Sequence, residues 1–214
     1  AIIFSDILML PYGLGQKVEF KKNFGPTLGK IDLNQISKVE EIDFLKSVHP
    51  IYKAIKKVST NPILNNKNTI GFVGAPWTLL VYMINQQSPK KNLKKDFFKD
   101  ELYINKILLI IEKFLKVHIK NQIDNGANVI QIFDSWAGLL EEKYLPNYIY
   151  APTLNLVNYV KSLNTPVICF PREIKNYNKF CEVIKPDAIS IDYNVDPKEI
   201  VKTIKIPVQG GLDP

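Results

Sequence analysis

Short apolar runs alternate with helix-like segments along the chain, and this alternation constrains the fold more than any other feature of the sequence. Six apolar runs have the length and composition of buried strands, and they span residues 1–8, 69–75, 129–134, 166–170, 188–193 and 207–210. Apolar residues spaced three and four positions apart predict helices between them, over 42–58, 77–84, 96–124, 146–163, 175–184 and 197–204. Such an alternation predicts a parallel sheet with right-handed crossovers.

Local signals set the expected ends of several elements. Asn125-Gly126 predicts the end of the long helix over 96–124, which we expect to contain a break. Asp196-Pro197 predicts a helix start, with an N-cap residue followed by proline at the first helical position. Residues 17–30 interrupt the alternation, and we expect an extended excursion or a hairpin over the mouth of a barrel.

The alternation alone is compatible with an open doubly wound sheet and with a (β/α)8 (TIM) barrel. No G-x-G-x-x-G follows a predicted strand and no G-x-x-x-x-G-K-[ST] occurs, which argues against the nucleotide-binding open sheets. We therefore expect an α/β fold, a TIM barrel present as an incomplete barrel of about six βα units. Residues 1–214 are predicted to form a single catalytic barrel domain, truncated at both ends because Ala1 already lies inside a predicted strand.

A single carboxylate, Asp6, lies in the otherwise apolar opening run and precedes a predicted turn at residues 11–15. Burying an ionised carboxylate without partners is costly, so hydrogen bonds, a counter-charge or protonation must compensate. Two interpretations remain open at this point. Asp6 contacts a ligand, or its carboxylate caps the backbone N–H groups of the following loop.

The charge and the cysteines limit the expected partners and setting. The net charge is +7, but Arg172 is the only arginine among the 28 basic residues, and the lysines are scattered over predicted helices. Nucleic-acid surfaces more often combine arginines, aromatic residues and a contiguous basic face, so we expect no nucleic-acid partner. No apolar run approaches the span of about 18 residues that crosses a membrane. Cys169 and Cys181 have neither C-x-x-C nor disulfide spacing, which favours a reducing cytoplasmic setting.

Four segments place unusual residues at the ends of predicted strands, where a barrel builds its active site. They are FSDIL at 4–8, GAPWTL at 74–79 with Tyr82 one turn later, FDSWAG at 133–138 and QGGLDP at 209–214. Together, and in this order, they resemble the uroporphyrinogen decarboxylase family of haem biosynthesis. The resemblance runs through the whole chain, and GAPWTL and FDSWAG are specific in combination.

The resemblance implies a cofactor-free decarboxylation. The four acetate side chains of uroporphyrinogen III, a cyclic tetrapyrrole, would each lose CO2 and leave a methyl group, giving coproporphyrinogen III. Protonating a pyrrole carbon first makes a cationic ring that accepts the electron pair. Asp6 matches the family carboxylate that accepts hydrogen bonds from the central pyrrole N–H groups, and its charge would stabilise that cation.

The resemblance also implies two further contacts. Tyr82 matches a tyrosine near Asp6 and the substrate, and Ser135 matches a serine that hydrogen-bonds a substrate carboxylate. Each residue has a structural alternative in the sequence. Tyr82 would pack beside Leu79 with a solvated hydroxyl, and Ser135 would cap a helix.

Three other residues are weaker candidates. Phe72 is predicted as core and pocket wall, and Arg172 as a partner of a substrate carboxylate or of an ordinary surface ion pair with Glu173 or Asp192. His118 shares a helical face with apolar residues, which indicates a packed histidine rather than a ligand.

The chain also departs from the family pattern. The family's arginine-bearing M-R-Q-A-G-R-Y motif would precede Ala1, and its H-G-x-x-P segment with a substrate-contacting histidine would follow Pro214. Gly211 stands where the family usually has Asn, and residues 173–175 differ from the small or glycine-rich sequence of bacterial members. We therefore expect part of a longer protein, one that forms homodimers when complete.

Two other functions compete with this interpretation. Zinc-dependent corrinoid or thiol methyltransferases share the superfamily, but they need clustered Cys and His ligands. Here no H-x-C pair occurs, and Cys169, Cys181, His49 and His118 fall in unrelated predicted elements. The other alternative is a catalytically incomplete barrel fragment. A phosphate-binding barrel is a weaker option, since only Gly210-Gly211 supplies glycines near the last strands.

Overall fold

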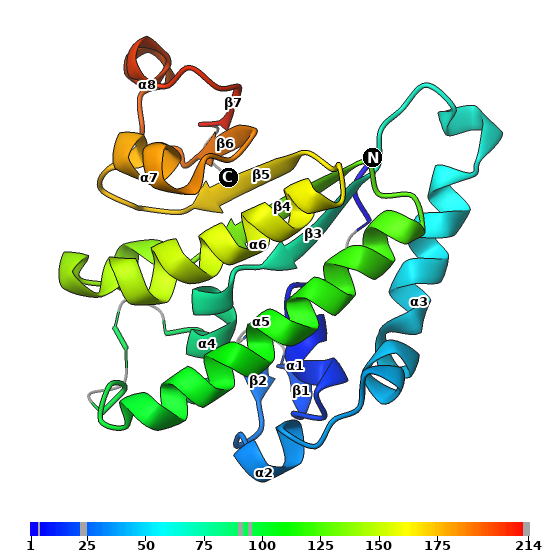
Figure 1. The fold of residues 1–214 in the computed structure, drawn as a ribbon, viewed down its shortest axis with the longest axis vertical. Coiled ribbons are helices and arrows are strands. Elements are labelled where there is room, and N and C mark those ends of the chain that lie inside the picture. Colours follow the sequence, from blue (N-terminus) through cyan, green and yellow to red (C-terminus); the bar gives the residue numbers. More distant parts are fainter. Residues whose placement is uncertain (4, 22–24, 90–91, 94–95, 212–214) are drawn as a thin grey trace.

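The structure is a computed structural model, and it describes residues 1–3, 5–21, 25–89, 92–93 and 96–211 (Figure 1). Its centre is a five-stranded parallel sheet in the order β3-β4-β5-β6-β7. The strands are β3 (Ile70–Gly74), β4 (Val129–Asp134), β5 (Val167–Pro171), β6 (Ala188–Ile191) and β7 (Val208–Gly210). Each strand pairs with the one before it in the chain, whereas a doubly wound sheet reverses its order at the switch point. The fold is therefore an incomplete (β/α)8 barrel.

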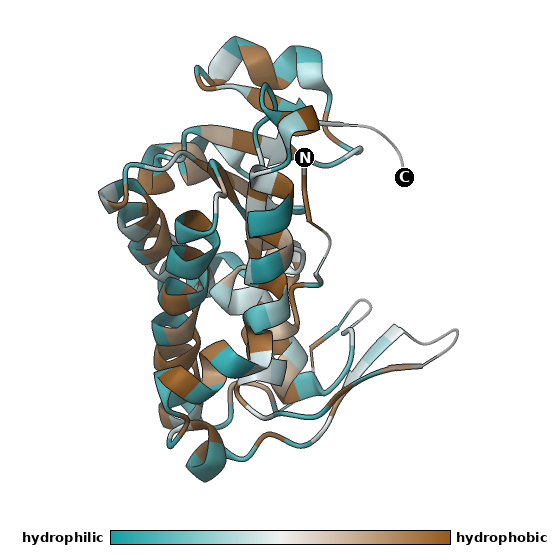
Figure 2. Cartoon of the chain, turned by 90° about the vertical axis from the view of Figure 1, so that its right-hand side faces the viewer, coloured by the Kyte–Doolittle hydropathy of each residue, from teal (hydrophilic) through white to brown (hydrophobic). Residues whose placement is uncertain are grey.

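Helices alternate with these strands, as the apolar spacing predicts. The longer ones are α3 (Glu41–Ser59), α4 (Pro76–Asn85), α5 (Glu101–Asp124), α6 (Ala151–Ser162), α7 (Tyr177–Ile184) and α8 (Pro197–Thr203). The short helices α1 (Met9–Gly13) and α2 (Leu33–Ile36) precede α3. Helical turns of other kinds cover Pro62–Leu64, Ala137–Leu139, Glu142–Tyr144 and Pro146–Tyr150. Figure 1 shows α3, α5 and α6 together on one side of the sheet, and Figure 2 shows hydrophobic residues along these helices.

The prediction of a strand over residues 1–8 is wrong. Among the described residues of this segment, only Ile2 pairs with the sheet, in a parallel bridge to Ile70 at the edge of β3. The backbone of Asp6 then adopts a left-handed conformation with φ of 67°, which ends the extended course. The chain continues into α1, where a turn was expected, and Leu8 and Leu10 are buried there. The apolar run is therefore explained by a buried helical turn rather than by a sheet strand.

The local predictions of a hairpin and of two helix ends are confirmed. Where residues 17–30 are described, β1 (Val18–Lys21) and β2 (Gly25–Leu28) pair as an antiparallel hairpin, and these two strands project from the body of the molecule in Figure 2. In the predicted stretch 96–124, residues 96–100 form a turn and a bend, and α5 starts after the side-chain cap of Asp100 and runs without interruption. Its end at Asn125 and the start of α8 at the Asp196 cap are confirmed.

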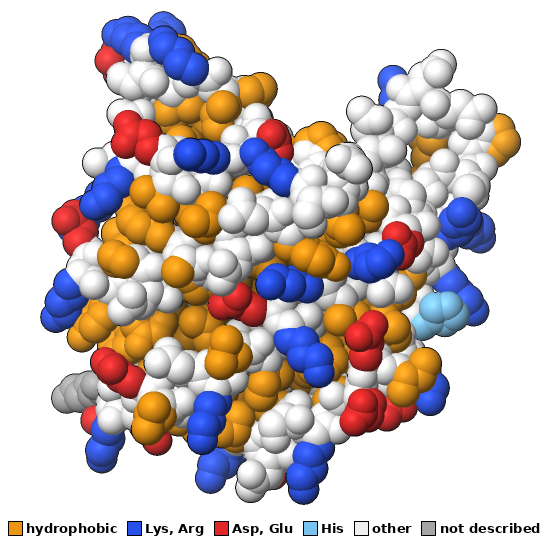
Figure 3. All heavy atoms as spheres, in the orientation of Figure 1, with side chains coloured by type: hydrophobic (Ala, Val, Ile, Leu, Met, Phe, Trp, Pro, Cys, Tyr) orange, Lys and Arg blue, Asp and Glu red, His pale blue; other side chains and the backbone are white. Residues whose placement is uncertain are grey.

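The helical layer and the inner face of the sheet are packed very differently. Helix α4 is almost fully buried, and α5 buries an apolar stripe that includes Ile107, Ile111 and Phe114. On the inner face, the rings of Phe72, Phe133 and Phe170 follow one another in edge-to-face contacts across β3, β4 and β5. None of the described helices has the length and apolar character needed to cross a membrane. On the face shown in Figure 3, lysines alternate with acidic and apolar side chains.

Candidate functional site

A cavity of about 370 Å³ opens at the carboxyl ends of β3 and β4. Four of the five residues predicted for a site contribute to its wall, namely Asp6, Phe72, Tyr82 and Ser135. The remaining lining residues are Ile2, Ile7, Leu8, Pro26 and Phe133. Its volume is in the range of small-molecule sites, and its wall is mainly apolar with a few polar groups.

Asp6 reaches the cavity from a tight turn. Its Oδ1 accepts a hydrogen bond of 2.7 Å from the Leu8 backbone N–H, so the carboxylate does cap the following loop. The same residue lines the cavity, so capping and ligand contact are not exclusive. A non-glycine residue with positive φ is uncommon, and Asp and Asn tolerate it better than other residues. This conformation at a cavity wall is typical of residues held in place for function.

The end of β3 allows this turn to approach closely. A Cβ atom added to Gly74 would lie 3.1 Å from the Ile7 Cβ atom and 3.0 Å from the Leu79 Cδ2 atom. A larger residue at this position would force the Ile7 or Leu79 side chain to shift by a few tenths of an ångström, so glycine allows the closest approach of the segment that carries Asp6. The glycine of the GAPWTL motif therefore helps to position the carboxylate.

Tyr82 enters the cavity from α4 and is electrostatically coupled to Asp6. Burial raises the pKa of the Tyr82 hydroxyl above its ordinary value, and the negative charge of Asp6 raises it further. The nearby Trp136 and Ser88 side chains lower this pKa and offset part of the increase. The phenol therefore stays protonated at neutral pH and is available as a hydrogen-bond donor.

Aromatic rings form one wall, and a hydroxyl lies at its edge. The Phe72 and Phe133 rings meet at a right angle with centroids 5.7 Å apart, on neighbouring strands. Ser135 follows β4 directly, and the helical turn at Ala137–Leu139 has Trp136, not Ser135, at its N-cap position. The alternative role of Ser135 as a cap for that turn is therefore wrong.

Arg172 is not among the described residues that line the cavity. Its Nη2 atom lies 3.4 Å from the Glu173 Oε1 atom in a partly exposed ion pair, which is the structural alternative that the sequence left open. Five members of the wall were not predicted as site residues, namely Ile2, Ile7, Leu8, Pro26 and Phe133. Pro26 comes from the hairpin predicted to lie over the barrel mouth, and Phe133 lies two residues before Ser135 in the FDSWAG motif.

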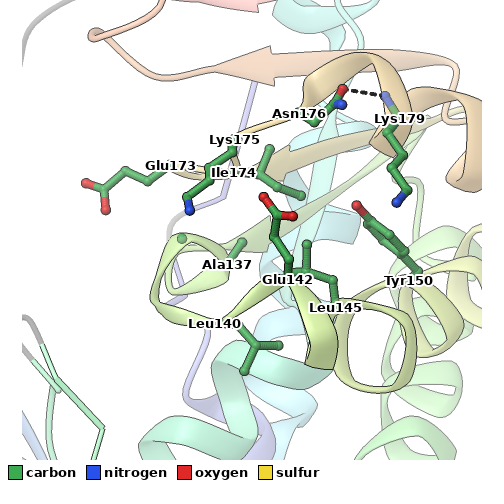
Figure 4. A pocket seen from close by; sticks show the side chains of 11 residues that line it. Ala137, Leu140, Glu142, Leu145, Tyr150, Glu173, Ile174, Lys175, Asn176 and Lys179 are labelled. Carbon is green, nitrogen blue, oxygen red and sulfur yellow. Dashed lines mark hydrogen bonds between the residues drawn. The ribbon is translucent and has the colours of Figure 1, made fainter.

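A second cavity of about 110 Å³ lies between the loops that follow β4 and β5 (Figure 4). Glu142 and Tyr150 line one side, and Lys175 and Lys179 line the other. The cavity includes the 173–175 loop, where the sequence departs from the family pattern. Its volume is well below that of sites for drug-sized ligands, so we do not assign the main site to it.

The histidines and cysteines do not assemble into a metal site in the described part of the chain. No group of three or more His, Cys, Asp or Glu side chains there is arranged to hold a metal ion. His118 is buried and its Nδ1 lies 2.9 Å from the Tyr52 hydroxyl, as expected for a packed helix histidine.

The chemistry of the cavity beside Asp6 follows from its lining. The Asp6 carboxylate is an acceptor, the Tyr82 phenol is a neutral donor, and the Ser135 hydroxyl serves as either. The surrounding phenylalanines and aliphatic side chains make the wall apolar, and a less polar environment strengthens electrostatic interactions. The cavity can therefore hold the apolar part of a small molecule and offers an acceptor at Asp6 for N–H donors.

Known proteins resemble this chain in sequence and in structure. The family model described as Uroporphyrinogen decarboxylase (URO-D) matches residues 1–214. Uroporphyrinogen decarboxylases of Rickettsia bellii (strain RML369-C) and Rickettsia rickettsii (strain Sheila Smith) are 37% and 36% identical, respectively, over the whole of this chain. The chain spans 64% and 63% of the length of these two relatives.

A solved structure supports the fold independently. A methyltransferase from Methanosarcina mazei superposes with a TM-score of 0.73 at 14% sequence identity. The match covers 98% of this chain and 64% of the methyltransferase chain. At that identity the likeness concerns the fold alone. The family model, in contrast, matches the sequence over residues 1–214, and this match shows that the chain belongs to the uroporphyrinogen decarboxylase family.

Proposed function

We propose that this chain provides the catalytic cavity of an enzyme that decarboxylates the four acetate side chains of uroporphyrinogen III to give coproporphyrinogen III. The observation that carries the proposal is the presence of Asp6, Tyr82 and Ser135 on one apolar cavity at the carboxyl ends of the strands. Membership of the family supports the reaction class. Because the chain spans less than two thirds of its relatives, the complete protein is the catalyst that we have in mind.

In this mechanism the negative charge of Asp6 lies beside the ring that becomes cationic. The pyrrole N–H groups of the macrocycle are donors only, so they need an acceptor oxygen at the centre of the ring. Asp6 Oδ1 already accepts from the Leu8 N–H, and the second carboxylate oxygen is the one we assign to the pyrroles. Protonation of a pyrrole carbon makes the ring cationic, and a fixed carboxylate in a dry cavity stabilises that cation more than it stabilises the neutral substrate.

Electron flow then needs no separate cofactor. The C–C bond to the acetate carboxylate breaks, CO2 leaves, and its electron pair neutralises the cationic ring. The resulting exocyclic carbon takes up a proton and becomes the methyl group, and the ring carbon releases the proton that it first gained, which restores the neutral pyrrole. We assign to Tyr82 a hydrogen bond that a protonated phenol can donate, and to Ser135 a substrate carboxylate.

The substitution Asp6→Asn in the complete enzyme tests the role of the charge. Asparagine tolerates positive φ and keeps an oxygen for the Leu8 N–H, so the fold should be retained. Loss of the charge should lower the decarboxylation rate by at least about 100-fold. Asp43→Asn is the matched control, because Asp43 is exposed on α3 and distant in sequence from the cavity lining.

Asp6→Ala separates capping from catalysis. Alanine loses both the acceptor for the Leu8 N–H and the tolerance of positive φ, so stability should fall by about 1 kcal/mol or more. Asp6→Asn should lose activity without this loss of stability. Near-native turnover of Asp6→Asn, measured as coproporphyrinogen formed per enzyme, would remove Asp6 from the mechanism.

A further inference from the structure

The turn that carries Ser135 is held by the first turn of α4. The Thr78 hydroxyl donates a hydrogen bond of 2.7 Å to Asp134 Oδ1 and accepts one of 3.1 Å from the Trp136 backbone N–H. Thr78 is fully buried and Asp134 is only 3% exposed. The two residues that flank Ser135 in the sequence are therefore tied to a single buried hydroxyl group.

The first turn of α4 also holds the segment 134–136 at a second point. The Trp77 indole N–H donates a hydrogen bond of 2.9 Å to the Trp136 carbonyl. The Trp136 ring in turn packs against the Tyr82 ring, with centroids 5.9 Å apart. Helix α4 thus presents Tyr82 to the cavity and also fixes the segment that presents Ser135. The relative position of these two cavity residues depends on this contact.

Asp134 has an ordinary structural role as well. The N-cap residue of α4, Ala75, makes no side-chain cap, and the Asp134 carboxyl instead receives hydrogen bonds from the backbone and hydroxyl of Thr78. Within the described part of the chain, however, Asp134 Oδ2 is buried without a hydrogen-bond partner. A buried unsatisfied oxygen is costly, and a neutral Asn or Ser would cap a helix without a buried carboxylate. Capping alone therefore does not account for this residue.

We propose that Thr78 and Asp134 are positioning residues, which hold the turn of residues 134–136 so that the Ser135 hydroxyl meets the substrate at a fixed distance from Tyr82. The assignment rests on the proposed function, because the contact given to Ser135 is that of the decarboxylation. Neither positioning residue is among those that line the cavity. Their effect on the substrate is therefore indirect and is proposed to pass through Ser135, whose two neighbours they hold.

A double-mutant cycle in the complete enzyme tests this pathway. Ser135→Ala removes a hydrogen bond to a substrate carboxylate and should raise KM by about 10-fold. Thr78→Val replaces the hydroxyl with a methyl group of similar size and should raise KM by about 5- to 10-fold with kcat within about 2-fold. If Thr78 acts through Ser135, the double variant should have the KM of Ser135→Ala alone. Two effects that multiply, or a Thr78→Val variant with the wild-type KM, would overturn the proposal.

Thr78→Ser is the conservative partner of Thr78→Val. It keeps the hydroxyl that bonds both Asp134 and Trp136, so KM should return to within about 2-fold of the wild-type value. A Thr78→Ser variant as impaired as Thr78→Val would mean that packing of the threonine methyl group, and not the hydroxyl, is what matters, which contradicts the proposal.

Tryptophan fluorescence gives a readout that does not depend on activity. Trp77 and Trp136 are the only two tryptophans of the 214-residue chain, and both belong to this contact. In that chain at submicromolar concentration, Thr78→Val should increase acrylamide quenching by about 2-fold or more and Thr78→Ser should not, since a loosened turn exposes the Trp136 ring to solvent. If the wild-type enzyme had no decarboxylase activity, the proposed function would fail, and the positioning proposal would be decided by this comparison alone. Equal quenching in all three proteins would reject it.

Asp134→Asn is the second variant, should Thr78→Val not fold. Burial raises the pKa of the Asp134 carboxyl to about 7, while the hydrogen bonds from Thr78 act to lower it. Of the groups near Asp134, Thr78 does not ionise and burial keeps the Cys169 thiol protonated by raising its pKa. The guanidinium of Arg172 pairs with Glu173. Wild-type fluorescence should therefore change between pH 6 and 8, and Asp134→Asn should abolish the change. A transition that persists in Asp134→Asn would exclude this carboxyl as part of the contact.

Discussion

At the scale of single residues, Asp6 shows how one side chain satisfies two requirements. Its Oδ1 oxygen completes the turn into α1, and the residue also faces the cavity with Tyr82. The sequence showed a carboxylate in an apolar run, and neither role alone follows from that pattern. The left-handed backbone of Asp6 is also invisible in the sequence, because Asp occurs in many conformations.

His118 gives a prediction about acid stability. Burial lowers its pKa from 6.5 to about 4, and it packs between α3 and α5 against Tyr52 and Phe44. The unfolded state therefore binds more protons than the folded state between pH 6.5 and 4. Stability from this group is present above pH 6.5 and is lost as the pH falls through that window, by about 3 kcal/mol in total.

Urea unfolding of the wild type and of His118→Gln at pH 7.5, 6 and 5 measures this contribution. The free energy of unfolding of the wild type should fall more steeply with decreasing pH than that of His118→Gln. His49→Gln is the matched control, because His49 is the other of the two histidines in the sequence and is exposed. Parallel pH dependences of the wild type and His118→Gln would show that the histidine does not contribute.

At the scale of elements, the start of α8 offers a simple test. Asp196 accepts a hydrogen bond of 2.8 Å from the Lys198 backbone N–H, and Pro197 occupies the first helical position. Asp196→Ala should destabilise the protein or locally unfold α8 by about 1 kcal/mol, and Asp196→Ser should cost less because serine also caps. Hydrogen exchange of α8 amides would reveal the change. Equal protection in the wild type and Asp196→Ala would mean that the cap contributes nothing.

Elements with strong local signals were predictable from the sequence. The strands β3 to β7, the helices between them and the hairpin follow from apolar spacing and from caps such as Asp196. The opening run was not predictable in the same way. Leu8 and Leu10 are as apolar as strand residues, but they are buried by a helical turn that starts after the left-handed Asp6. A short apolar run does not distinguish these two structures.

The candidate site was predictable where motifs end strands, and less so elsewhere. Phe72 lies on β3 and Ser135 directly follows the neighbouring strand β4, and parallel strands bring their carboxyl ends to one edge. Pro26 and the capping contact of Asp134 depend on tertiary packing. No local pattern in the sequence predicts the hydrogen bond between Thr78 and Asp134, which are 56 positions apart. Arg172 followed the plainer alternative, because its neighbour Glu173 is within reach.

At the scale of the whole molecule, the sheet is open on both sides in the described residues. β3 borders the sheet at one side, with only the bridge from Ile2 beyond it, and β7 ends the other side. The inner face carries Phe133 and Phe170, which are only partly buried. A complete barrel would pair both edges and cover this face. We therefore expect the 214-residue chain alone to be inactive as a decarboxylase and poorly soluble.

Association through the edge of β7 can be tested with a charge. Gln209 is exposed on β7, the last strand of the sheet, and its Nε2 atom donates to the Ser190 hydroxyl. A lysine on an edge strand opposes pairing with another chain, so Gln209→Lys should slow aggregation of the 214-residue chain several-fold, as measured by light scattering. Gln35→Lys adds the same charge to the exposed surface of α2 and should leave the rate unchanged. If both variants aggregate at equal rates, net charge rather than the open edge controls solubility.

Soluble wild-type chain that converts uroporphyrinogen to coproporphyrinogen would show that the five strands suffice for activity.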